Sequence, residues 1–560
     1  MKLGSSFTLE MTSTGNKLSE VNASPKVNRI SDGIPTDDYY ANNVSTLLSF
    51  VVNRYSDLLN TEEIRFSTSV LELSAEAQRL YARILSCRGP IFLKSQFVYR
   101  EVKDVASAFE ELARNKLIKS NSEFPSELLC QKLTLSQLRE AFELQEFKGS
   151  KSLLVSKIQD IHAEENILER IRLRLPWFEL DQTDRIATFS LLFFGDHYQD
   201  LSTFVVHDLG ILRLEQYTLD SKNRQFKSRQ EIDCYLDWWA LSERMNEEEP
   251  LETEQLIESI QTLKSSNTNR TLERQRSKLL NRIGREVERR GELLQSLRAY
   301  RCSSLHPARE RQMRVCHRLG QFNDVETLRT TILANPWTIE EKLFAEKFKS
   351  KSRIAVKYNT NEQILIDPFT DSIENFACSE FEARGWSAWH LENNLPSALF
   401  GLAYWDWVYA PVQEAFVNPF QIGPRDLYSP EFFAVRRELC VDPMMDSMPL
   451  AQRLEQTFEQ KFGISNPLVN WKIFDKSVLE TVVRCMGEES IRKLLQLMQP
   501  DLRQMRSGFP DLFVVKPDDT FEFVEVKGPT DQVRPNQHIW LQSLASEELP
   551  VSVLKFKLVA

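Results

Sequence analysis

Cysteine is sparse in this chain of 560 residues, and its eight cysteines are scattered. They form no CxxC pair, and the seven histidines do not cluster with them, so the sequence predicts neither a disulfide framework nor a zinc site. Scattered, unpaired cysteines are typical of reduced thiols inside cells. We therefore expect a cytoplasmic protein.

Glycine and long apolar runs are also lacking. Only 17 residues are glycine, which favours a helix-rich protein with few tight turns. No apolar run is long enough to cross a membrane, and the polar residues that follow Met1 predict no signal peptide. A chain of this length is expected to form several domains rather than one core.

Positive charge is not in excess overall: 70 Lys and Arg stand against 80 Asp and Glu, a net charge of −10. This balance argues against nonspecific binding of nucleic acid by the whole molecule. Residues 270–318 are the exception, because fourteen Lys and Arg there face five Glu, a local charge of 14 − 5 = +9. Such a segment is typical of a polyanion-binding surface and equally of a charged, solvated helix face.

The most informative stretch lies near the C-terminus, where two apolar, β-rich runs flank the turn residues 516–520. We predict a β-hairpin centred on Asp518. In the predicted register Val515 lies opposite Phe521, Phe513 opposite Phe523, and Asp511 opposite Glu525.

This register gathers two carboxylates and an ammonium group on an apolar strand pair. Glu525 and Lys527 share a face with Phe523, and Asp511 lies opposite Glu525. Buried charges cost several kcal/mol unless they are paired or bound to a metal. One interpretation is an ordinary amphipathic hairpin with Glu525 and Lys527 in solvent. The other is a metal-dependent phosphodiesterase site, in which carboxylates bind a hard cation and Lys527 orients water or neutralises charge on the phosphate.

Three motifs extend this pattern: Arg506-Ser507-Gly508-Phe509-Pro510-Asp511, Val524-Glu525-Val526-Lys527-Gly528-Pro529-Thr530-Asp531 and Gln537-His538-Ile539-Trp540-Leu541. An Asp followed by Glu-x-Lys is the signature of the PD-(D/E)xK nuclease superfamily. The three motifs together resemble its VRR-NUC domain, and the whole chain resembles the Fanconi-associated nucleases, as a bacterial member. The resemblance implies a 5′-flap endonuclease and 5′-to-3′ exonuclease that acts on branched or flapped double-stranded DNA in interstrand-crosslink repair.

The resemblance also implies a set of site residues. In this family a further carboxylate follows a Gly-Trp stretch and precedes a long apolar helix, and Glu392 occupies that place here, with Glu382 as the competing candidate. The implied ligands of one or two ions, Mg²⁺ or Mn²⁺, are Glu392, Asp511, Glu525 and the Val526 carbonyl oxygen. The resemblance further implies that Lys527 lies beside the nucleophilic water and that Gln537 orients water or a phosphate oxygen.

We expect three groups of basic residues to bind DNA. Most would contact phosphates, which give affinity rather than sequence preference. The groups are Arg503 and Arg506 with Lys516 near the scissile bond, Arg285, Arg289 and Arg290 in the basic segment, and Lys148, Lys151 and Lys157 in a helix–break–helix segment that resembles a SAP motif. The alternative for that last segment is a helical hairpin that only packs.

The predicted fold is multidomain, mainly α-helical in its N-terminal two-thirds, with a C-terminal α/β restriction-endonuclease-like domain. A helical insertion at about 410–495 is thought to block dimerisation in this family, so the resemblance implies a monomer. The predicted segments are a disordered lead-in (1–37), a winged-helix-like or purely structural helical domain (38–130), the SAP-like motif (131–165), a helical body with a flexible acidic joint near 246–268 (166–268), basic tetratricopeptide-like repeats (269–375) and the nuclease domain (376–560).

Two further hypotheses remain open from the sequence. A DNA-binding repair scaffold with a decayed nuclease fold is one, although the intact Asp511, Glu525 and Lys527 argue against it. A nuclease that acts on four-way junctions or on RNA is the other.

Overall fold

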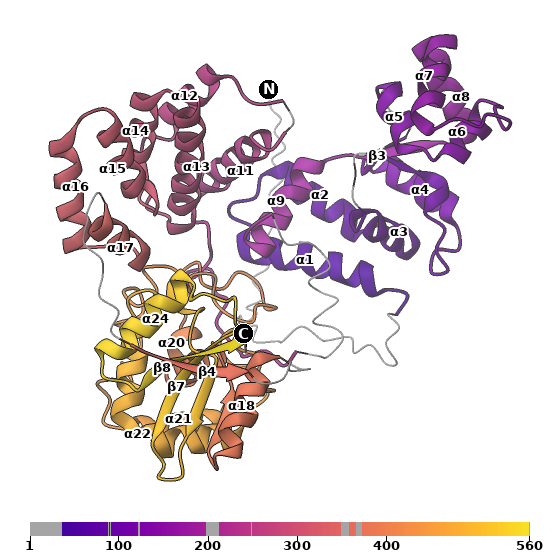
Figure 1. Ribbon diagram of the computed structural model, residues 1–560. Helices are drawn as coiled ribbons and strands as arrows, with labels where there is room; N and C mark the ends of the chain where they lie inside the picture. Colours follow the sequence, from indigo (N-terminus) through magenta and orange to yellow (C-terminus); the bar gives the residue numbers. More distant parts are fainter. Residues whose placement is uncertain are drawn as a thin grey trace, which may run out of the picture.

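The computed structural model describes residues 36–558, apart from 88, 90, 121–123, 198–211, 248, 349–357 and 366–371. The predicted lead-in therefore falls almost wholly outside the described residues. Figure 1 shows three bodies, which are an N-terminal helical body, a stack of helices and a C-terminal domain built on a sheet. No helix in the described part is both long and apolar enough to span a membrane.

The first domain packs helices around a small antiparallel sheet. Its strands are β1 (Ile91–Leu93), β2 (Ile118–Ser120) and β3 (Trp177–Leu180), in the order β1-β3-β2. Phe92, Phe109 and Phe178 meet in its core. The helices are α1 (Tyr39–Tyr55), α2 (Thr61–Leu71), α3 (Ala75–Leu85), α4 (Val105–Arg114) and α9 (Thr183–Phe194).

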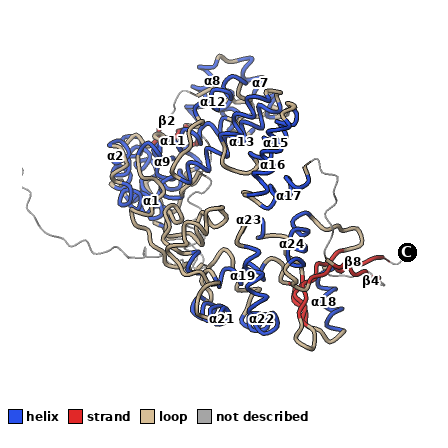
Figure 2. Tube along the Cα trace, turned by 90° about the vertical axis from the view of Figure 1, so that its left-hand side faces the viewer, coloured by secondary structure: helices blue, strands red, loops and turns tan. Residues whose placement is uncertain are grey.

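A four-helix unit interrupts this domain between β2 and β3. It comprises α5 (Ser126–Lys132), α6 (Leu135–Ala141), α7 (Lys151–Ile161) and α8 (Glu164–Arg174), which share a core of their own. Ser150 caps the N-terminus of α7, because its hydroxyl accepts from the Leu153 amide. Figures 1 and 2 both place α7 and α8 far from the C-terminal sheet.

The predicted boundary at residue 166 is therefore wrong. β3 and α9 return to the first domain, where Phe178 and Phe189 are buried. The pairing of β3 with strands more than fifty residues earlier is a long-range contact, and no local pattern reveals it.

The predicted flexible acidic joint is also wrong in part. α12 (Thr253–Thr262) lies within it, after α11 (Arg229–Arg244). Leu256, Ile260 and Leu263 are buried against α13 (Arg270–Arg289), because their helical spacing forms an apolar stripe among the acidic residues.

The second body stacks helix pairs over the basic segment. α13 is followed by α14 (Leu293–Cys302), α15 (Ala308–Arg318), α16 (Phe322–Ala334) and α17 (Ile339–Lys347). Gly291 and Gly320, with φ of 91° and 74°, form the turns before α14 and α16, where a left-handed backbone favours glycine.

The C-terminal domain is a five-stranded mixed sheet in the order β4-β8-β7-β6-β5. β4, β8 and β7 run parallel, and β6 and β5 are antiparallel to their neighbours. α18 (Ile373–Ala383) covers one face, and the other packs against a large apolar core with α24 (Pro535–Ser546). The strands are β4 (Asn359–Leu365), β5 (Ser387–His390), β6 (Leu512–Val515), β7 (Phe521–Lys527) and β8 (Val551–Leu558).

The predicted helical insertion is only partly helical. Helices α19 (Asn394–Ala403) and α20 (Trp405–Val408) precede it, and α21 (Leu450–Lys461) and α22 (Lys476–Met498) form its second half. Residues 409–449 contain turns and no regular helix or strand. Aromatic residues such as Phe432 nevertheless bury this stretch in the large core of the C-terminal domain.

The loop 410–426 of this insertion joins the nuclease domain to both other bodies. Arg54 of α1 donates to Val417 O at 2.8 Å, and Asn418 donates to Phe193 O of α9 at 3.1 Å. The buried Glu414 carboxylate accepts from the Thr271 amide, at 2.8 Å, in the first turn of α13. A carboxylate at a helix N-terminus satisfies amides that have no partner within the helix.

Candidate active site

The hairpin predicted around Asp518 is present, and its register is confirmed. Phe513 pairs with Phe523 and Val515 with Phe521. Asp511 directly precedes β6, and its Oδ2 accepts from the Val526 amide at 2.8 Å. Lys527 Nζ lies 2.5 Å from Glu525 Oε1. The hairpin therefore brings the two predicted carboxylates and the predicted lysine together.

These groups are buried, which disfavours the solvated amphipathic hairpin. Glu525 is fully buried and Lys527 is 8% exposed. The Lys527 ammonium is the donor nearest to Glu525 Oε1, and Oε2 has no hydrogen-bond partner among the described residues. Burial raises the pKa of Asp511 to about 6, and burial together with the charge of Asp511 raises the pKa of Glu525 to about 7. Two crowded carboxylates with free oxygens fit a divalent cation, which would supply the missing positive charge.

Glu392 lies beside this pair, in the turn between β5 and α19. The amides of Leu391 and Glu392 both donate to Asp511 O, at 3.2 and 3.1 Å. Glu392 has a φ of 45°, a left-handed conformation that is strained for a residue with a side chain. Its carboxylate is close enough to raise the pKa of both Asp511 and Glu525.

Two residues near this cluster were missed from the sequence. His390 Nε2 lies 2.9 Å from Glu392 Oε1, and one ligand atom each from His390, Glu392 and Asp511 lie within 4.8 Å of one another. Glu374, in the first turn of α18, also raises the pKa of Asp511. His390 stands two residues before Glu392, a spacing that could have singled it out. The competing candidate Glu382 is exposed at the far end of α18 and is not among the charges that act on either hairpin carboxylate.

Gln537 lies in the first turn of α24, the helix that Pro535 opens as predicted. Its Oε1 accepts from the Arg534 amide at 2.9 Å, so this oxygen caps the helix and its amide nitrogen alone is left for another partner. The next residue, His538, bonds the Tyr358 hydroxyl at 2.7 Å through Nδ1.

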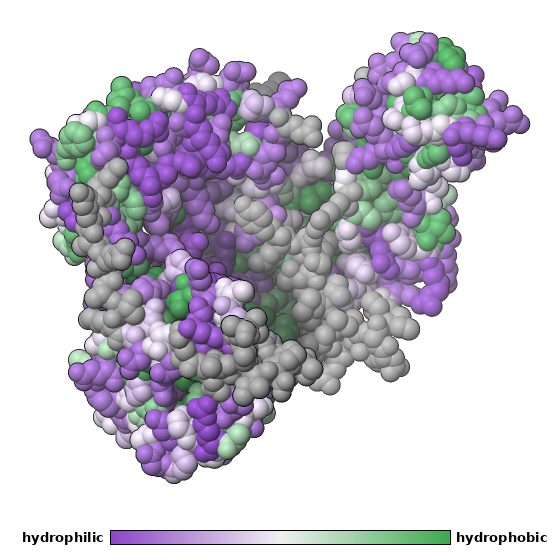
Figure 3. All heavy atoms as spheres, in the orientation of Figure 1, coloured by the Kyte–Doolittle hydropathy of each residue, from purple (hydrophilic) through white to green (hydrophobic). Residues whose placement is uncertain are grey.

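Four cations meet between α13, the insertion and α23 (Leu502–Met505). Lys278 is exposed at the surface, but protein atoms crowd around its ammonium group, and this desolvation lowers its pKa. The nearby positive charges of Arg274, Arg503 and Arg425 lower the pKa further. In Figure 3 the stacked helices, the sheet domain and the first domain surround a hollow, and hydrophilic residues gather where the stacked helices face it. Positive charges held together in this way fit an anionic ligand such as a phosphate.

The three arginines predicted in the basic segment differ in their surroundings. Arg285 and Arg289 have side chains 47% and 66% exposed, with only distant ion pairs to Glu288 and Glu286. Arg290 instead donates to Leu251 O at 2.8 Å and to Glu286 at 3.1 Å. Arg290 therefore tethers α12 to α13, and the structure argues against its use for DNA.

Replacing Arg285 and Arg289 together with alanine is expected to weaken flap-DNA binding. It should also reduce the slope of log K against log salt by about 1 to 2, since each lost phosphate contact removes about one released counterion. Titrations at several salt concentrations measure this slope. Arg290→Ala is the matched variant, expected to lower the melting temperature and keep the slope. An unchanged slope in the double variant would mean that these arginines face only solvent.

The other predicted DNA contacts are distributed over distant surfaces. Arg503 and Arg506 are exposed close to the hairpin, with Arg506 stacked 5.2 Å from the Tyr428 ring. Lys516 lies 5.1 Å from the Trp386 ring. In the four-helix unit Lys148 and Lys157 are exposed, whereas the ammonium of Lys151 donates to Gln131 O.

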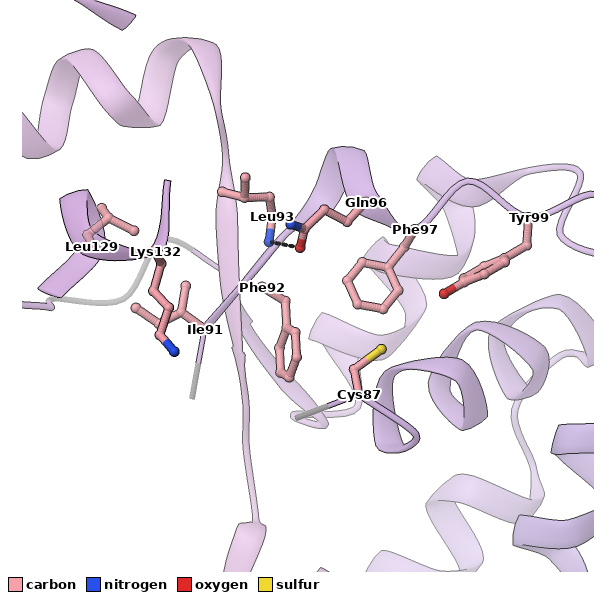
Figure 4. Close-up of a pocket in the computed structure, with 9 residues that line it drawn as sticks. All are labelled: Cys87, Ile91, Phe92, Leu93, Gln96, Phe97, Tyr99, Leu129 and Lys132. Carbon is pink, nitrogen blue, oxygen red and sulfur yellow. Dashed lines mark hydrogen bonds between the residues drawn. The ribbon is translucent and has the colours of Figure 1, made fainter. Parts of the chain in front are cut away.

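A cavity elsewhere in the molecule has different chemistry. It has a volume of about 430 Å³ and lies between the first domain and α5. Figure 4 shows its lining, in which Leu93 N donates to Gln96 and Lys132 is the one charged group drawn. Its remaining lining is mostly apolar, so it offers no carboxylate pair for a metal.

Comparisons with known proteins agree with the geometry of the hairpin. Residues 449–557 match the VRR-NUC domain, and residues 38–119 match the "FAN1, HTH domain". A Fanconi-associated nuclease 1 homolog of Pseudomonas aeruginosa is 27% identical over 93% of this chain and 96% of its own. The chain is similar to Fanconi-associated nucleases over most of its length and carries a VRR-NUC domain. A homolog from Arabidopsis thaliana, in the same family, is 23% identical over 93% of this chain and 67% of its own.

The family resemblance extends to solved structures. The crystal structure of paFAN1 bound to 2nt 5′flap DNA with gap has a TM-score of 0.80 and 26% identity, and covers 94% of this chain and 99% of that one. A second structure, with 1nt 5′flap DNA, has a TM-score of 0.79. The likeness therefore includes all three bodies of the chain, not its nuclease domain alone.

Proposed function

We propose that the protein is a structure-selective DNA nuclease that cleaves 5′-flap DNA and degrades DNA from 5′ to 3′, in interstrand-crosslink repair. The observation that carries this proposal is the Asp511–Glu525–Lys527 set, in which two carboxylates crowd together around one ammonium group and Glu525 is fully buried. The full-length likeness to a relative solved with 5′-flap DNA supports the substrate.

The cofactor proposed is Mg²⁺ or Mn²⁺. Asp511, Glu525 and Glu392 would hold one or two ions, with the Val526 carbonyl oxygen as a further ligand. All of these donors are oxygens, as hard cations prefer. A bound divalent cation supplies a Lewis acid that stabilises charge developing on the phosphate.

The residues around the cation do the rest of the chemistry. The ion pair with Glu525 holds the Lys527 ammonium at the site, where it orients the attacking water or offsets negative charge on the phosphate. The amide nitrogen of Gln537 is free to hold water or a phosphate oxygen. Burial excludes bulk water and strengthens each of these interactions.

DNA would be held at several places along the molecule. Arg503, Lys278 and Arg274 would form one phosphate-binding group, to which Arg425 adds positive charge although its guanidinium donates to Gln225 and to Gly195 O. The exposed Arg506 would make a further contact. The exposed Lys148 and Lys157 would hold duplex far from the scissile bond, on the four-helix unit in Figure 1. We propose that the protein acts as a monomer.

The proposal is tested with 5′-labelled flap DNA incubated with protein and Mg²⁺ or Mn²⁺. Cleavage near the junction is expected with either metal and is expected to stop with chelator. Fork, four-way junction and RNA substrates in the same assay identify the preferred structure. Tight flap binding without cleavage under any metal would overturn the nuclease in favour of a DNA-binding scaffold.

A further inference from the structure

The carboxylate of Glu392 has a single partner, although it is proposed to hold a cation. Its side chain is 46% exposed, at the edge of the sheet. His390 Nε2, 2.9 Å from Oε1, is its only hydrogen-bond partner within the described part of the chain. An ionised carboxylate can only accept, so the imidazole nitrogen is the donor.

The backbone around this pair is fixed, but the side chain of Glu392 is not. Two backbone hydrogen bonds to Asp511 O hold residues 391 and 392 in place, and the pairing of β5 with β6 sets His390 opposite Leu512. Glu392 itself lies in a turn with a left-handed backbone, which is strained for a residue with a side chain. A half-exposed glutamate has several rotamers, and ordering it costs conformational entropy.

We propose that His390 is a positioning residue of the metal site. Its Nε2–H binds one oxygen of Glu392 and leaves the other oxygen for the cation, beside Asp511. His390 thus orders the carboxylate before the cation arrives, so less of the binding energy is lost to ordering. Hydrogen-bond partners of metal ligands commonly change metal affinity 10- to 100-fold when they are removed. This inference rests on the proposed metal site.

The edge position of His390 makes the inference testable without loss of the fold. Its side chain is 31% exposed, and its side-chain hydrogen bond within the described residues goes to Glu392. The metal-free melting temperature is therefore expected to stay close to that of the unchanged protein after His390→Ala. Ser387→Ala, on an exposed residue of the same strand, is the matched control.

The experiment measures Mn²⁺ binding to the DNA-free protein by titration calorimetry. His390→Ala is expected to weaken binding about 10- to 100-fold. His390→Gln should recover most of this loss, because the glutamine amide can donate from nearly the same place as Nε2. Glu392→Gln, which removes the charge itself, should lose at least as much affinity as His390→Ala.

Each outcome decides between this inference and the proposed function. Unchanged affinity in His390→Ala, or equal losses in His390→Ala and His390→Gln, would overturn the positioning role. Asp511→Ala is the reference for the site itself, and is expected to abolish Mn²⁺ binding. If Asp511→Ala binds Mn²⁺ normally, the proposed metal site is wrong. If Asp511→Ala loses Mn²⁺ binding but His390→Ala binds Mn²⁺ normally, the metal site stands and only the proposed role of His390 is wrong.

Discussion

Alanine in place of Asp511 or Glu525 is expected to reduce cleavage of 5′-flap DNA by roughly a thousandfold or more, and to leave flap binding within a few-fold. A metal cation contributes several kcal/mol to the transition state, and each 1.36 kcal/mol is a factor of ten in rate. Binding of the flap depends mainly on phosphate contacts elsewhere. Single-turnover cleavage and equilibrium binding, measured on the same labelled flap, separate the two effects.

Glu522→Ala is the matched control for these variants. Glu522 lies on the same strand, β7, but pairs with Val514 and is partly exposed. It should leave the cleavage rate nearly unchanged. Near-normal turnover in Asp511→Ala or Glu525→Ala would remove both residues from the catalytic site.

Divalent-cation binding is expected to weaken roughly a hundredfold or more between pH 8 and pH 5. The raised pKa values of Asp511 and Glu525, about 6 and about 7, mean that protons occupy both groups in acid. The cation binds the ionised forms, so each proton competes by about tenfold for every pH unit below its pKa. Titration calorimetry with Mn²⁺ at each pH unit measures this dependence.

The metal-free protein should show the opposite dependence of stability. Burial raises the folded-state pKa of Glu525 above the ordinary carboxyl range, so folding favours its protonated form. Its contribution to stability is complete below about pH 4, the pKa of an unfolded glutamate. That contribution is lost as the pH rises through about 7.

The difference in melting temperature between the unchanged protein and Glu525→Gln isolates this group from other carboxylates. Without metal, this difference should favour the variant increasingly from pH 5 to pH 8. Added Mn²⁺ should stabilise the unchanged protein at pH 8 and have little effect at pH 5. A difference that does not vary with pH would mean that Glu525 does not titrate in this range.

The hairpin could be predicted from sequence because its information is local. Alternating side chains, a Pro-Asp turn and the Asp…Glu-x-Lys spacing together specify its register and its charged face. Glu392 required the family resemblance, since nothing local distinguishes it from Glu382. Its proximity to Asp511 arises from backbone hydrogen bonds between residues more than a hundred positions apart.

The remaining features depend on long-range contacts. β3 pairs with β1 and β2, from which the inserted four-helix unit separates it in the sequence. The guanidinium of Arg290 donates a hydrogen bond to Leu251 O instead of facing solvent. A charge count over 270–318 cannot separate arginines that tether helices from those that face solvent. Glu374 was missed because only the fold brings α18 to Asp511, whereas the position of His390, two residues before Glu392, was a local signal that went unused.

The loop 410–426 has a consequence for how the protein unfolds. Its bonds to Arg54, Phe193 and Thr271 fasten the nuclease domain to two bodies formed by earlier parts of the chain. Separating the nuclease domain would leave the Glu414 carboxylate and the first amides of α13 without each other. The three bodies should therefore melt in one cooperative transition. A fragment that begins at residue 358, and so keeps β4 and α18, should be less stable than the same residues within the whole chain.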